Sequence, residues 1–376
     1  MSLKNETKTF YKEYIAGMSS EKLGRDLQSD SQRLKELYQQ AIKEKHPQQD
    51  PENISFGGRL LSLLSALTNR LSPVRRLVFG IALLSFFFYF ILGLLGINQP
   101  LLLPLSFLAM LALLCIELLE KSDAQKELNL ARDIQRSLLP SSTFSKGDLE
   151  TFSFAATAQQ VGGDYVDVIE SEKGVYVVIA DVSGKGLQAA LYMVRFQALV
   201  KLLLNKHTMS PKELLLELND YVKSNKSDRT FITASVAFFP HDGEQMIYAR
   251  AGQNQPVHYR HSSERTTTYK TPGLGLGMCP TGMLKENLEE ITVDFHSGDS
   301  ILFYTDGLTE ARNRAGEEFG LHRLDGILSI YGSLHAKSVV LKIQNQIEAF
   351  IGEMDPLDDI TFTVVHRNQP IKREHD

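Results

Sequence analysis

Residues 179–191 read IADVSGKGLQAAL, and this stretch decides how the central part of the chain is interpreted. An apolar run typical of a buried strand ends at Asp181, and a helix-like segment begins after Gly186. The turn between them is similar to a phosphate-binding loop, but a Walker A loop needs GxxxxGK followed by Ser or Thr. Here Lys185 is followed by glycine and the first glycine is missing, so a nucleotide loop is disfavoured. The open question is whether Asp181 binds a metal ion or only caps the helix.

Other acidic residues also stand at the ends of predicted strands. They are Asp164 in VGGDYVDV, Asp306 after ILFYT, and Asp358 with Asp359 before ITFTVV. Each alone is typical of a turn or a helix cap. If the fold brings them into one cleft, their repulsion costs several kcal/mol unless they are protonated or divalent cations neutralise them. All-oxygen ligation favours Mg²⁺ or Mn²⁺, and there is no His/Cys cluster that would indicate zinc.

Glycines adjoin these acids, and they would let backbone carbonyls and water approach an ion. The glycines that would shape the backbone of such a site are Gly162, Gly163, Gly184, Gly186 and Gly307.

An uncharged segment extends from Leu77 to Ile116, about twice the ~20 residues that one membrane helix needs. Polar residues 98–99 and Pro100 interrupt it, which predicts a transmembrane helical hairpin with spans at 77–97 and 101–119. Arginines precede the first span and the turn has none, so both termini are expected in the cytoplasm, with the chain a multi-pass protein of the cell inner membrane. A buried helix pair in a soluble core and a re-entrant hairpin are the alternatives.

Composition excludes several classes of protein. The net charge of −5 gives no reason to expect nucleic-acid binding. Two distant cysteines, Cys115 and Cys279, provide neither a zinc spacing nor a disulfide framework, which is consistent with a reducing cytosol. The polar N-terminus is not a cleavable signal peptide.

The segments that flank the hairpin are predicted to be helical. Residues 19–45 form a polar helix, 46–53 a linker, and 57–71 an amphipathic helix that either contacts membrane lipid or packs on protein. After the hairpin, an apolar stripe ends before Pro140 and predicts one helix, either a short dimerising coiled coil or a helix packed on the next domain. Its members are Ala124, Leu128, Ala131, Ile134 and Leu138.

Residues 150–367 alternate between strand-like and helix-like stretches. Three strands lie before residue 183, and a long helix follows at 186–206. Ser210, Pro211 and Glu213 form a capping box that starts a second helix. Residues 241–243 connect a hairpin, and further strands are expected at 256–261, 266–270, 289–295, 300–306 and 359–366, with helices at 319–331 and 335–351. Runs of strands with paired helices between them favour two sheets sandwiched by helices.

At these residues the chain resembles the protein phosphatase 2C (PPM) superfamily of metal-dependent protein serine/threonine phosphatases, and within it the bacterial SpoIIE/RsbU-like branch. The strings that carry the resemblance appear in the family's order over about 131–366. They are IQRSLLP, VGGDYVDV, ADVSGKGLQAAL, TPGLGLGM, GDSILFYTDGLTEARN, EEFGLHRL and DDITFTVV.

The resemblance implies an α+β fold, an αββα sandwich with two Mn²⁺ or Mg²⁺ ions at one end. Asp181 would bridge both ions, the carbonyl of Val182 and Asp164 would serve the first, and Asp306 and Asp358 the second. Asp359, which stands where relatives often have Asn, is a further candidate metal ligand. The implied domains are a helical region (1–76), the hairpin (77–119), a linker helix (120–142), the phosphatase domain (143–367) and a tail (368–376).

The implied activity is hydrolysis of phosphoserine or phosphothreonine by a water that two metal ions activate. The family's usual substrates are regulatory proteins, anti-sigma-factor antagonists or similar STAS-type proteins, and in relatives the linker helix makes a homodimer and controls activity. The chain departs from the family at Thr157, Ala158 and Gln253, where relatives have Pro-Ala and a histidine. The phosphate-binding arginine of eukaryotic relatives has no evident counterpart. A catalytically silent binding module and a membrane-tethered nucleotide cyclase are the alternative functions.

Overall fold

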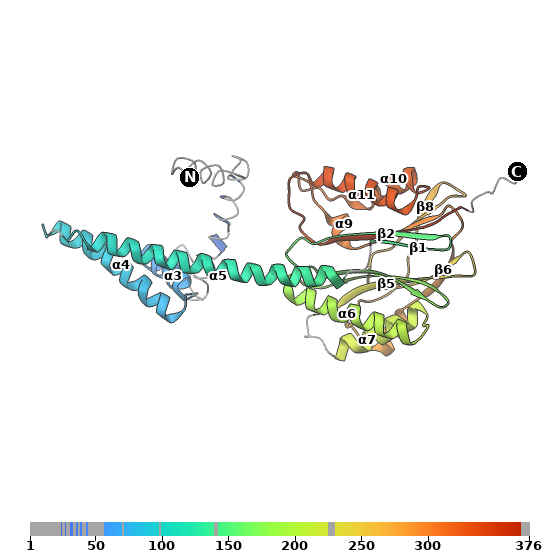
Figure 1. Cartoon of the computed structure of the whole chain (residues 1–376), viewed down its shortest axis with the longest axis horizontal. Helices are drawn as coiled ribbons and strands as arrows, with labels where there is room; N and C mark the ends of the chain where they lie inside the picture. Colours follow the sequence, from blue (N-terminus) through green and yellow to red (C-terminus); the bar gives the residue numbers. More distant parts are fainter. Residues whose placement is uncertain are drawn as a thin grey trace, which may run out of the picture. The chain divides into compact units, whose positions relative to one another are not determined.

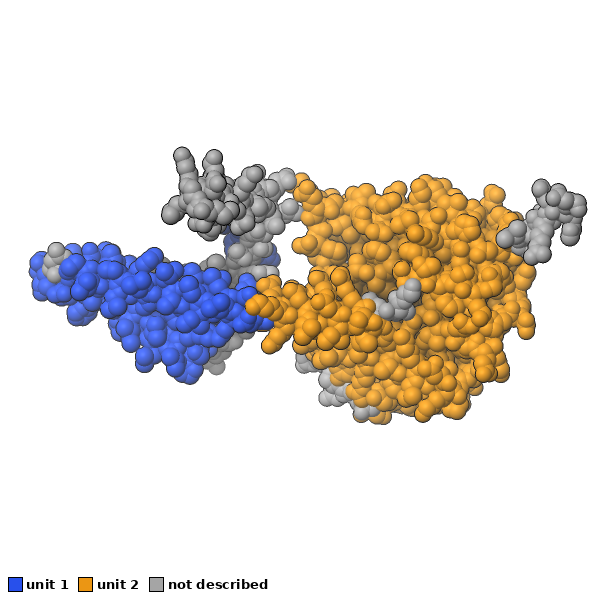
Figure 2. Space-filling view, in the orientation of Figure 1, with its two compact units in different colours: residues 1–123 blue, residues 124–376 orange. Residues whose placement is uncertain are grey.

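The computed structural model describes residues 56–69, 71–97, 99–138, 142–224 and 230–369, together with scattered positions between 24 and 43. Predictions for the linker at 46–53, most of the polar helix at 19–45 and most of the tail therefore lie outside the described residues. The chain divides into two compact units, residues 1–123 and residues 124–376, which Figure 2 colours separately. Each unit is described by itself.

The first unit contains a helical hairpin of strongly apolar helices. Helix α3 spans Phe56–Asn69 and α4 spans Pro73–Leu94, while α5 begins at Leu102 and continues to Leu138. By length and composition, α4 and α5 are apolar enough to cross a membrane, and only 6% of the most apolar window of each is buried. The second predicted span and the predicted linker helix are therefore one continuous helix, with no break at residue 119.

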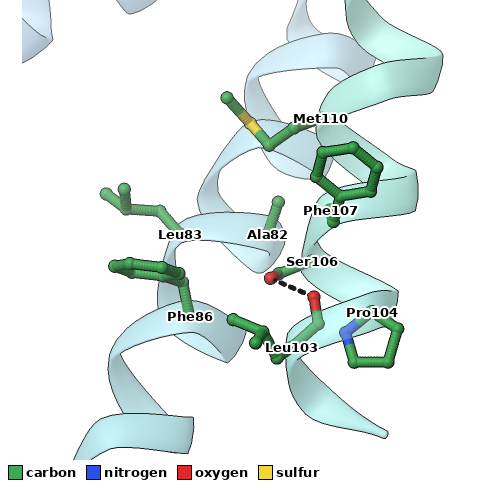
Figure 3. A pocket seen from close by; sticks show the side chains of 8 residues that line it. All are labelled: Ala82, Leu83, Phe86, Leu103, Pro104, Ser106, Phe107 and Met110. Carbon is green, nitrogen blue, oxygen red and sulfur yellow. Dashed lines mark hydrogen bonds between the residues drawn. The ribbon is translucent and has the colours of Figure 1, made fainter.

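Contacts between α4 and α5 differ along the hairpin. Arg75 pairs with Glu117 and, through both guanidinium nitrogens, with Glu120. Further along, a groove of about 610 Å³ lies between the helices, and residues of both helices line it, among them Phe86 of α4 and Phe107 of α5 (Figure 3). Among the residues that line the groove, Ser106 alone has a hydroxyl, and this hydroxyl donates to the carbonyl of Leu103 at 2.9 Å, within the normal range for such a bond. Nothing in the groove's lining is suited to polar chemistry.

The second unit contains two antiparallel sheets, in agreement with the prediction. One has the strand order β1-β2-β11-β10-β7-β8 and the other the order β3-β4-β5-β6-β9. The strands span Thr143–Lys146 (β1), Leu149–Ala156 (β2), Asp164–Ser171 (β3), Gly174–Val182 (β4), Ile232–Pro240 (β5), Gln245–Ala251 (β6), Val257–Arg260 (β7), Arg265–Thr268 (β8), Glu290–Asp294 (β9), Ser300–Tyr304 (β10) and Ile360–Arg367 (β11).

Helices cover the outer face of each sheet, as Figure 1 shows. Helices α6 and α7 pack on the sheet that contains β3–β6, while α10 and α11 pack on the other sheet. These elements span Leu187–Lys206 (α6), Pro211–Ser224 (α7), Gly320–Tyr331 (α10) and Ala336–Ile351 (α11). The predicted αββα sandwich is thus confirmed, and a cyclase-type βαββαβ core is not what the described residues form.

The layers are held by three apolar cores. One lies between the sheets, with Val177, Phe239 and Phe303 among its members, and each of the others lies between a sheet and its helices. Helix α6 is also long and apolar enough to cross a membrane, but residues such as Met193 and Phe196 are buried against the sheet, so α6 is a core helix.

Local signals account for several boundaries. The capping box is present, because the Ser210 amide donates to Glu213 Oε2 at 2.9 Å and the Glu213 amide to Ser210 Oγ at 3.3 Å. Three short elements were not predicted: β1, α8 (Thr281–Asn287) and α9 (Asp306–Glu310). Each has seven residues or fewer, too short for periodicity to be read.

Candidate metal centre

Strand ends place the five predicted acids at one end of the sandwich. Asp164 opens β3 and is the register partner of Asp181 near the end of β4. In the other sheet, Asp306 follows β10, and Asp358 with Asp359 precedes β11, which runs antiparallel to β10. Antiparallel pairing sets the end of one strand beside the start of the next, so residues far apart in sequence become neighbours.

The carboxylates interact electrostatically. Burial, then Asp306, Asp358 and Asp359, raise the pKa of Asp181 from 3.8 to about 7. Burial, then Asp181 and Asp359, raise the pKa of Asp164 well above its ordinary value. Carboxylates that raise one another's pKa in this way are characteristic of a functional acidic site.

Asp164 is oriented by a residue that the sequence analysis missed. The hydroxyl of Thr305, a fully buried residue, donates to Asp164 Oδ2 at 2.8 Å. The amide of Thr361 donates to the same hydroxyl oxygen at 3.2 Å, so the threonine bridges the two sheets. A hydroxyl residue directly before a strand-end aspartate was the available signal in the sequence.

Asp359 holds a loop. Its Oδ1 accepts the Ala158 amide and its Oδ2 the Gly163 amide, both at 2.8 Å. Both oxygens are thus engaged by backbone N–H groups. Asp358, its exposed neighbour, instead pairs with Lys185 at 2.8 Å. Asp358 accepts one backbone N–H, that of Asp359, where Asp359 accepts two, so Asp358 is the less constrained carboxylate and the better candidate ion ligand.

Three glycines near the acids leave little or no room for a side chain, and at Gly162 a Cβ would lie 2.5 Å from Asp359 Oδ2. A Cβ on Gly307 would lie 1.9 Å from the carbonyl oxygen of Asp359. A Cβ on Gly163 would lie 3.0 Å from the carbonyl oxygen of Val182, so that carbonyl, a predicted ligand, lies directly against the VGGD loop. Gly184 and Gly186 have φ of +105° and +73°, a region that L-residues rarely adopt.

The donor chemistry fits hard divalent cations. Carboxylate oxygens and the Val182 carbonyl are the ligands that Mg²⁺ and Mn²⁺ prefer. In the described part of the chain, no three His, Cys, Asp or Glu side chains surround a common point closely enough to ligate an ion as they stand. Asp306 and Asp358 are exposed, and both contribute to the raised pKa of Asp181.

The end of α5 contacts the loop before Asp164, in agreement with one of the two expectations for the linker helix, that it packs on the next domain. Gln135 Nε2 donates to the Gly162 carbonyl at 2.7 Å, and the Gly162 amide donates to Gln135 Oε1 at 3.1 Å. Arg132 donates to the carbonyls of Gln160 and Gln159 at 2.7 and 3.0 Å. Gln135 of the IQRSLLP motif, together with Arg132 just before the motif, therefore holds the segment that contains the VGGD loop.

Gln253, which stands where relatives have histidine, is connected to the site by one intervening residue, Thr233. Its Oε1 accepts a hydrogen bond from Thr233, the register partner of Asp181. Gln253 is 3% exposed, and its Nε2 has no hydrogen-bond partner among the described residues.

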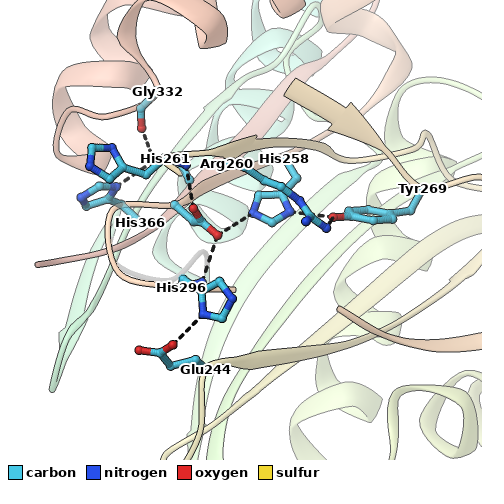
Figure 4. A network of polar contacts seen from close by, with 10 residues as sticks. Glu244, His258, Arg260, His261, Tyr269, His296, Gly332 and His366 are labelled. Atoms are coloured by element: carbon cyan, nitrogen blue, oxygen red, sulfur yellow. Dashed lines mark hydrogen bonds and ion pairs between the residues drawn. The ribbon is translucent and has the colours of Figure 1, made fainter. Parts of the chain in front are cut away.

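A second polar cluster lies at the opposite strand ends. Asp299 precedes β10, whereas Asp306 follows it, and His366 is near the end of β11, whereas Asp358 precedes it. His258 Nδ1 lies 2.7 Å from the hydroxyl oxygen of Tyr269, beside which Figure 4 shows it, and His258 Nε2 lies 3.2 Å from Asp299 Oδ2. Backbone amides of His261 and His296 also donate to Asp299. These hydrogen bonds satisfy a buried aspartate and close the far edge of the sandwich.

Comparisons with known proteins agree with this architecture. Residues 171–368 match the model of the family described as Stage II sporulation protein E (SpoIIE). The chain is 28% identical over 198 residues to the phosphoserine phosphatase RsbU of Bacillus subtilis, covering 52% of this chain and 57% of RsbU. It is 28% identical over 276 residues to protein IcfG of Synechocystis, covering 64% of this chain and 42% of IcfG. The chain thus spans about half the length of these curated relatives.

A solved structure has the same fold. The SiaA-PP2C domain of Pseudomonas aeruginosa superposes with a TM-score of 0.58 at 21% identity, covering 66% of this chain and 99% of that domain. The family match extends over more than half of the sequence and includes four of the five acids. The chain therefore belongs to the SpoIIE family, within the SpoIIE/RsbU branch of the PPM phosphatases.

Proposed function

We propose that the chain is a metal-dependent protein serine/threonine phosphatase that removes phosphate from a regulatory protein in signal transduction. The observation that carries the proposal is the convergence of carboxylates from both sheets at one end of the sandwich, with the pKa of Asp181 raised to about 7 by burial and by its acidic neighbours. Membership of the SpoIIE family and the similarity to RsbU, itself described as a phosphoserine phosphatase, support it.

In this proposal the acids hold two Mn²⁺ or Mg²⁺ ions. Asp181 contributes to both, Asp164 and the Val182 carbonyl to the first, and Asp306 and Asp358 to the second. When bound, the cations supply a water nucleophile at neutral pH and offset charge on the transferred phosphoryl group.

The chain's own residues prepare this site. Thr305 fixes the orientation of Asp164, and Asp359 anchors the loop in front of it. Asp306 and Asp358 are exposed at the mouth, where a phosphorylated side chain of another protein can reach them. In this proposal the nucleophile is a water molecule, so hydrolysis needs no nucleophilic side chain.

Phosphate release from p-nitrophenyl phosphate by the full-length chain in detergent tests the activity. We expect hydrolysis with Mn²⁺, none with excess chelator, and a loss of at least ~100-fold in Asp181→Asn, because a bridging ligand is removed. Asp242→Asn, at an exposed hairpin turn, is the matched control. Wild-type hydrolysis that persists in chelator would contradict the metal mechanism, and absent hydrolysis with tight Mn²⁺ binding would favour a silent binding module.

The substrate is proposed to be a phosphorylated anti-sigma-factor antagonist or a similar STAS-type protein. This is supported by the similarity to RsbU. Dephosphorylation of a phosphoserine-bearing STAS domain, compared with a phosphopeptide of the same sequence, tests whether the enzyme recognises the folded partner. Equal rates on both would argue against a dedicated protein substrate.

The hairpin is proposed to anchor the phosphatase in the inner membrane with both termini in the cytoplasm, with α5 contributing to a homodimer. The apolar character of α4 and α5 supports the anchor, and the exposed apolar side chains Leu130 and Ile134 of α5 support a dimer. Cysteine-accessibility labelling at both ends tests the topology. Leu128→Glu with Ile134→Glu should produce monomers in analytical ultracentrifugation, and an unchanged mass would contradict dimerisation through α5.

A further inference from the structure

Lys185, in the SGKG turn, occupies an oxygen that the proposed metal centre needs. Its Nζ lies 2.8 Å from Asp358 Oδ2 and 2.8 Å from the Leu357 carbonyl oxygen. The other Asp358 oxygen accepts the amide of Asp359 at 3.0 Å. Each oxygen of Asp358 therefore already accepts a hydrogen bond, and a cation that binds this carboxylate has to compete with the ammonium of Lys185.

The ion pair between Lys185 and Asp358 is weak. The side chains of Lys185 and Asp358 are 52% and 49% exposed, and ion pairs at such exposure are weak. A divalent cation on a carboxylate repels an adjacent ammonium, so the two cannot share Asp358. Gly184 and Gly186 flank the lysine; a Cβ at Gly184 would meet no atom within 4 Å, whereas one at Gly186 would lie 3.2 Å from Gln159 Oε1, so the open space is on the Gly184 side of the lysine.

A displaced Lys185 would remain at the mouth of the site. Its backbone is tied to the site because Asp181, near the end of β4, lies four residues earlier and Gly186 is the N-cap of α6. An ammonium on a long flexible stem can bind a phosphate as a point charge. Of the anions near the displaced ammonium, a substrate phosphate bound at the acids would attract it most strongly.

We propose that Lys185 is an exchangeable counter-ion: it competes with a divalent cation for Asp358 and, once displaced, binds the substrate's phosphate. This rests on the proposed phosphatase function. Lys185 would then provide a positive charge that binds the phosphate, a role for which the sequence has no evident arginine. A purely structural lysine, which ties the Leu357 loop to the SGKG turn, predicts the opposite effect on metal binding, because its removal would loosen the ligand loop.

The experiment measures binding without catalysis. Isothermal titration of Mn²⁺ into the full-length chain in detergent is compared for wild type, Lys185→Met and Lys185→Arg. Lys146→Met is the matched control, because Lys146 forms an equally exposed pair with Glu170 away from the acids. Loss of the competing charge should tighten Mn²⁺ binding ~3–10-fold in Lys185→Met only. In an Asp358→Asn background this gain should vanish.

Titration of inorganic phosphate into the Mn²⁺-saturated proteins completes the test. Lys185→Met should bind phosphate ~10-fold more weakly than wild type, with Lys185→Arg close to wild type. Unchanged or weaker Mn²⁺ binding in Lys185→Met overturns the proposal, and so does unchanged phosphate binding. If wild type binds no Mn²⁺, the proposed function itself fails. If it binds Mn²⁺ and hydrolyses substrate while Lys185→Met titrates identically, only this inference fails.

Discussion

The side-chain amide of Gln135 forms two hydrogen bonds with the backbone of Gly162, one donated and one accepted. Gln135 is on α5 and is 6% exposed, while Gly162 stands two residues before Asp164. By pairing with both the N–H and the C=O of Gly162, this side-chain amide takes the place of the hydrogen bonds that a neighbouring strand would form. The contact therefore fixes the position of the VGGD loop, and with it the predicted ligand that follows.

Replacement of Gln135 by Leu should weaken the metal centre. Both backbone groups of Gly162 would lose their partner, at ~1–3 kcal/mol for each buried group left unsatisfied, and the loop would relax. We expect ~10-fold weaker Mn²⁺ binding by calorimetry, a cost consistent with part of that energy. Arg136→Gln, on the exposed side of the same helix, should bind Mn²⁺ like wild type. Equal affinities in the two variants would contradict a positioning role for Gln135.

Thr305→Val should impair the site while the fold persists. The variant keeps the shape of the side chain but removes the hydroxyl that donates to Asp164. Asp164 would then be free to rotate away from the ion, so weaker Mn²⁺ binding and at least ~10-fold slower p-nitrophenyl phosphate hydrolysis are expected. Thr305→Ser keeps the hydroxyl and should restore most of both properties. A serine variant as poor as the valine variant would show that packing, not the hydrogen bond, matters here.

Gly307→Ala should destabilise the second unit. The new methyl would lie 1.9 Å from the Asp359 carbonyl oxygen, and the backbone must shift to relieve the clash. Overpacking of this kind costs ~1–3 kcal/mol, measurable as a lower urea midpoint. Gly326→Ala within α10, where a Cβ meets no atom within 4 Å, is the matched control and should gain ~0.5–1 kcal/mol from helix propensity. Similar midpoints for the two variants would contradict the close approach at Gly307.

Stability in chelator should fall as pH rises. The folded-state pKa of Asp181 is about 7 against an ordinary 3.8, so between these values the folded chain binds more protons than the unfolded chain. By linkage the stabilisation is complete below pH 3.8 and is lost as pH rises through 7. Thermal unfolding between pH 5 and 8 in chelator should therefore show a declining midpoint that Asp181→Asn flattens. Added Mn²⁺ should raise the midpoint most at high pH, and a midpoint that rises with pH in chelator would refute the assignment.

Several features of this protein are determined by the sequence alone, because each depends on neighbours along the chain. The uncharged run from Leu77 to Ile116 determines the apolar hairpin helices, and the Ser210–Glu213 capping box determines where α7 begins. The alternation of the strands and their paired helices sufficed for the αββα prediction. The motif strings sufficed for the family.

Tertiary structure decided what depends on contacts across long separations. Only strand pairing brings Asp164 beside Asp181, and only the packed sheets set Thr305 against Asp164, 141 residues away. The different surroundings of Asp358 and Asp359 arise in the same way, since adjacent residues before one strand point to different partners, Lys185 and the Ala158–Gly163 loop. Periodicity and motif spacing describe a residue's own element. They contain no information on which distant backbone group or side chain that element will meet.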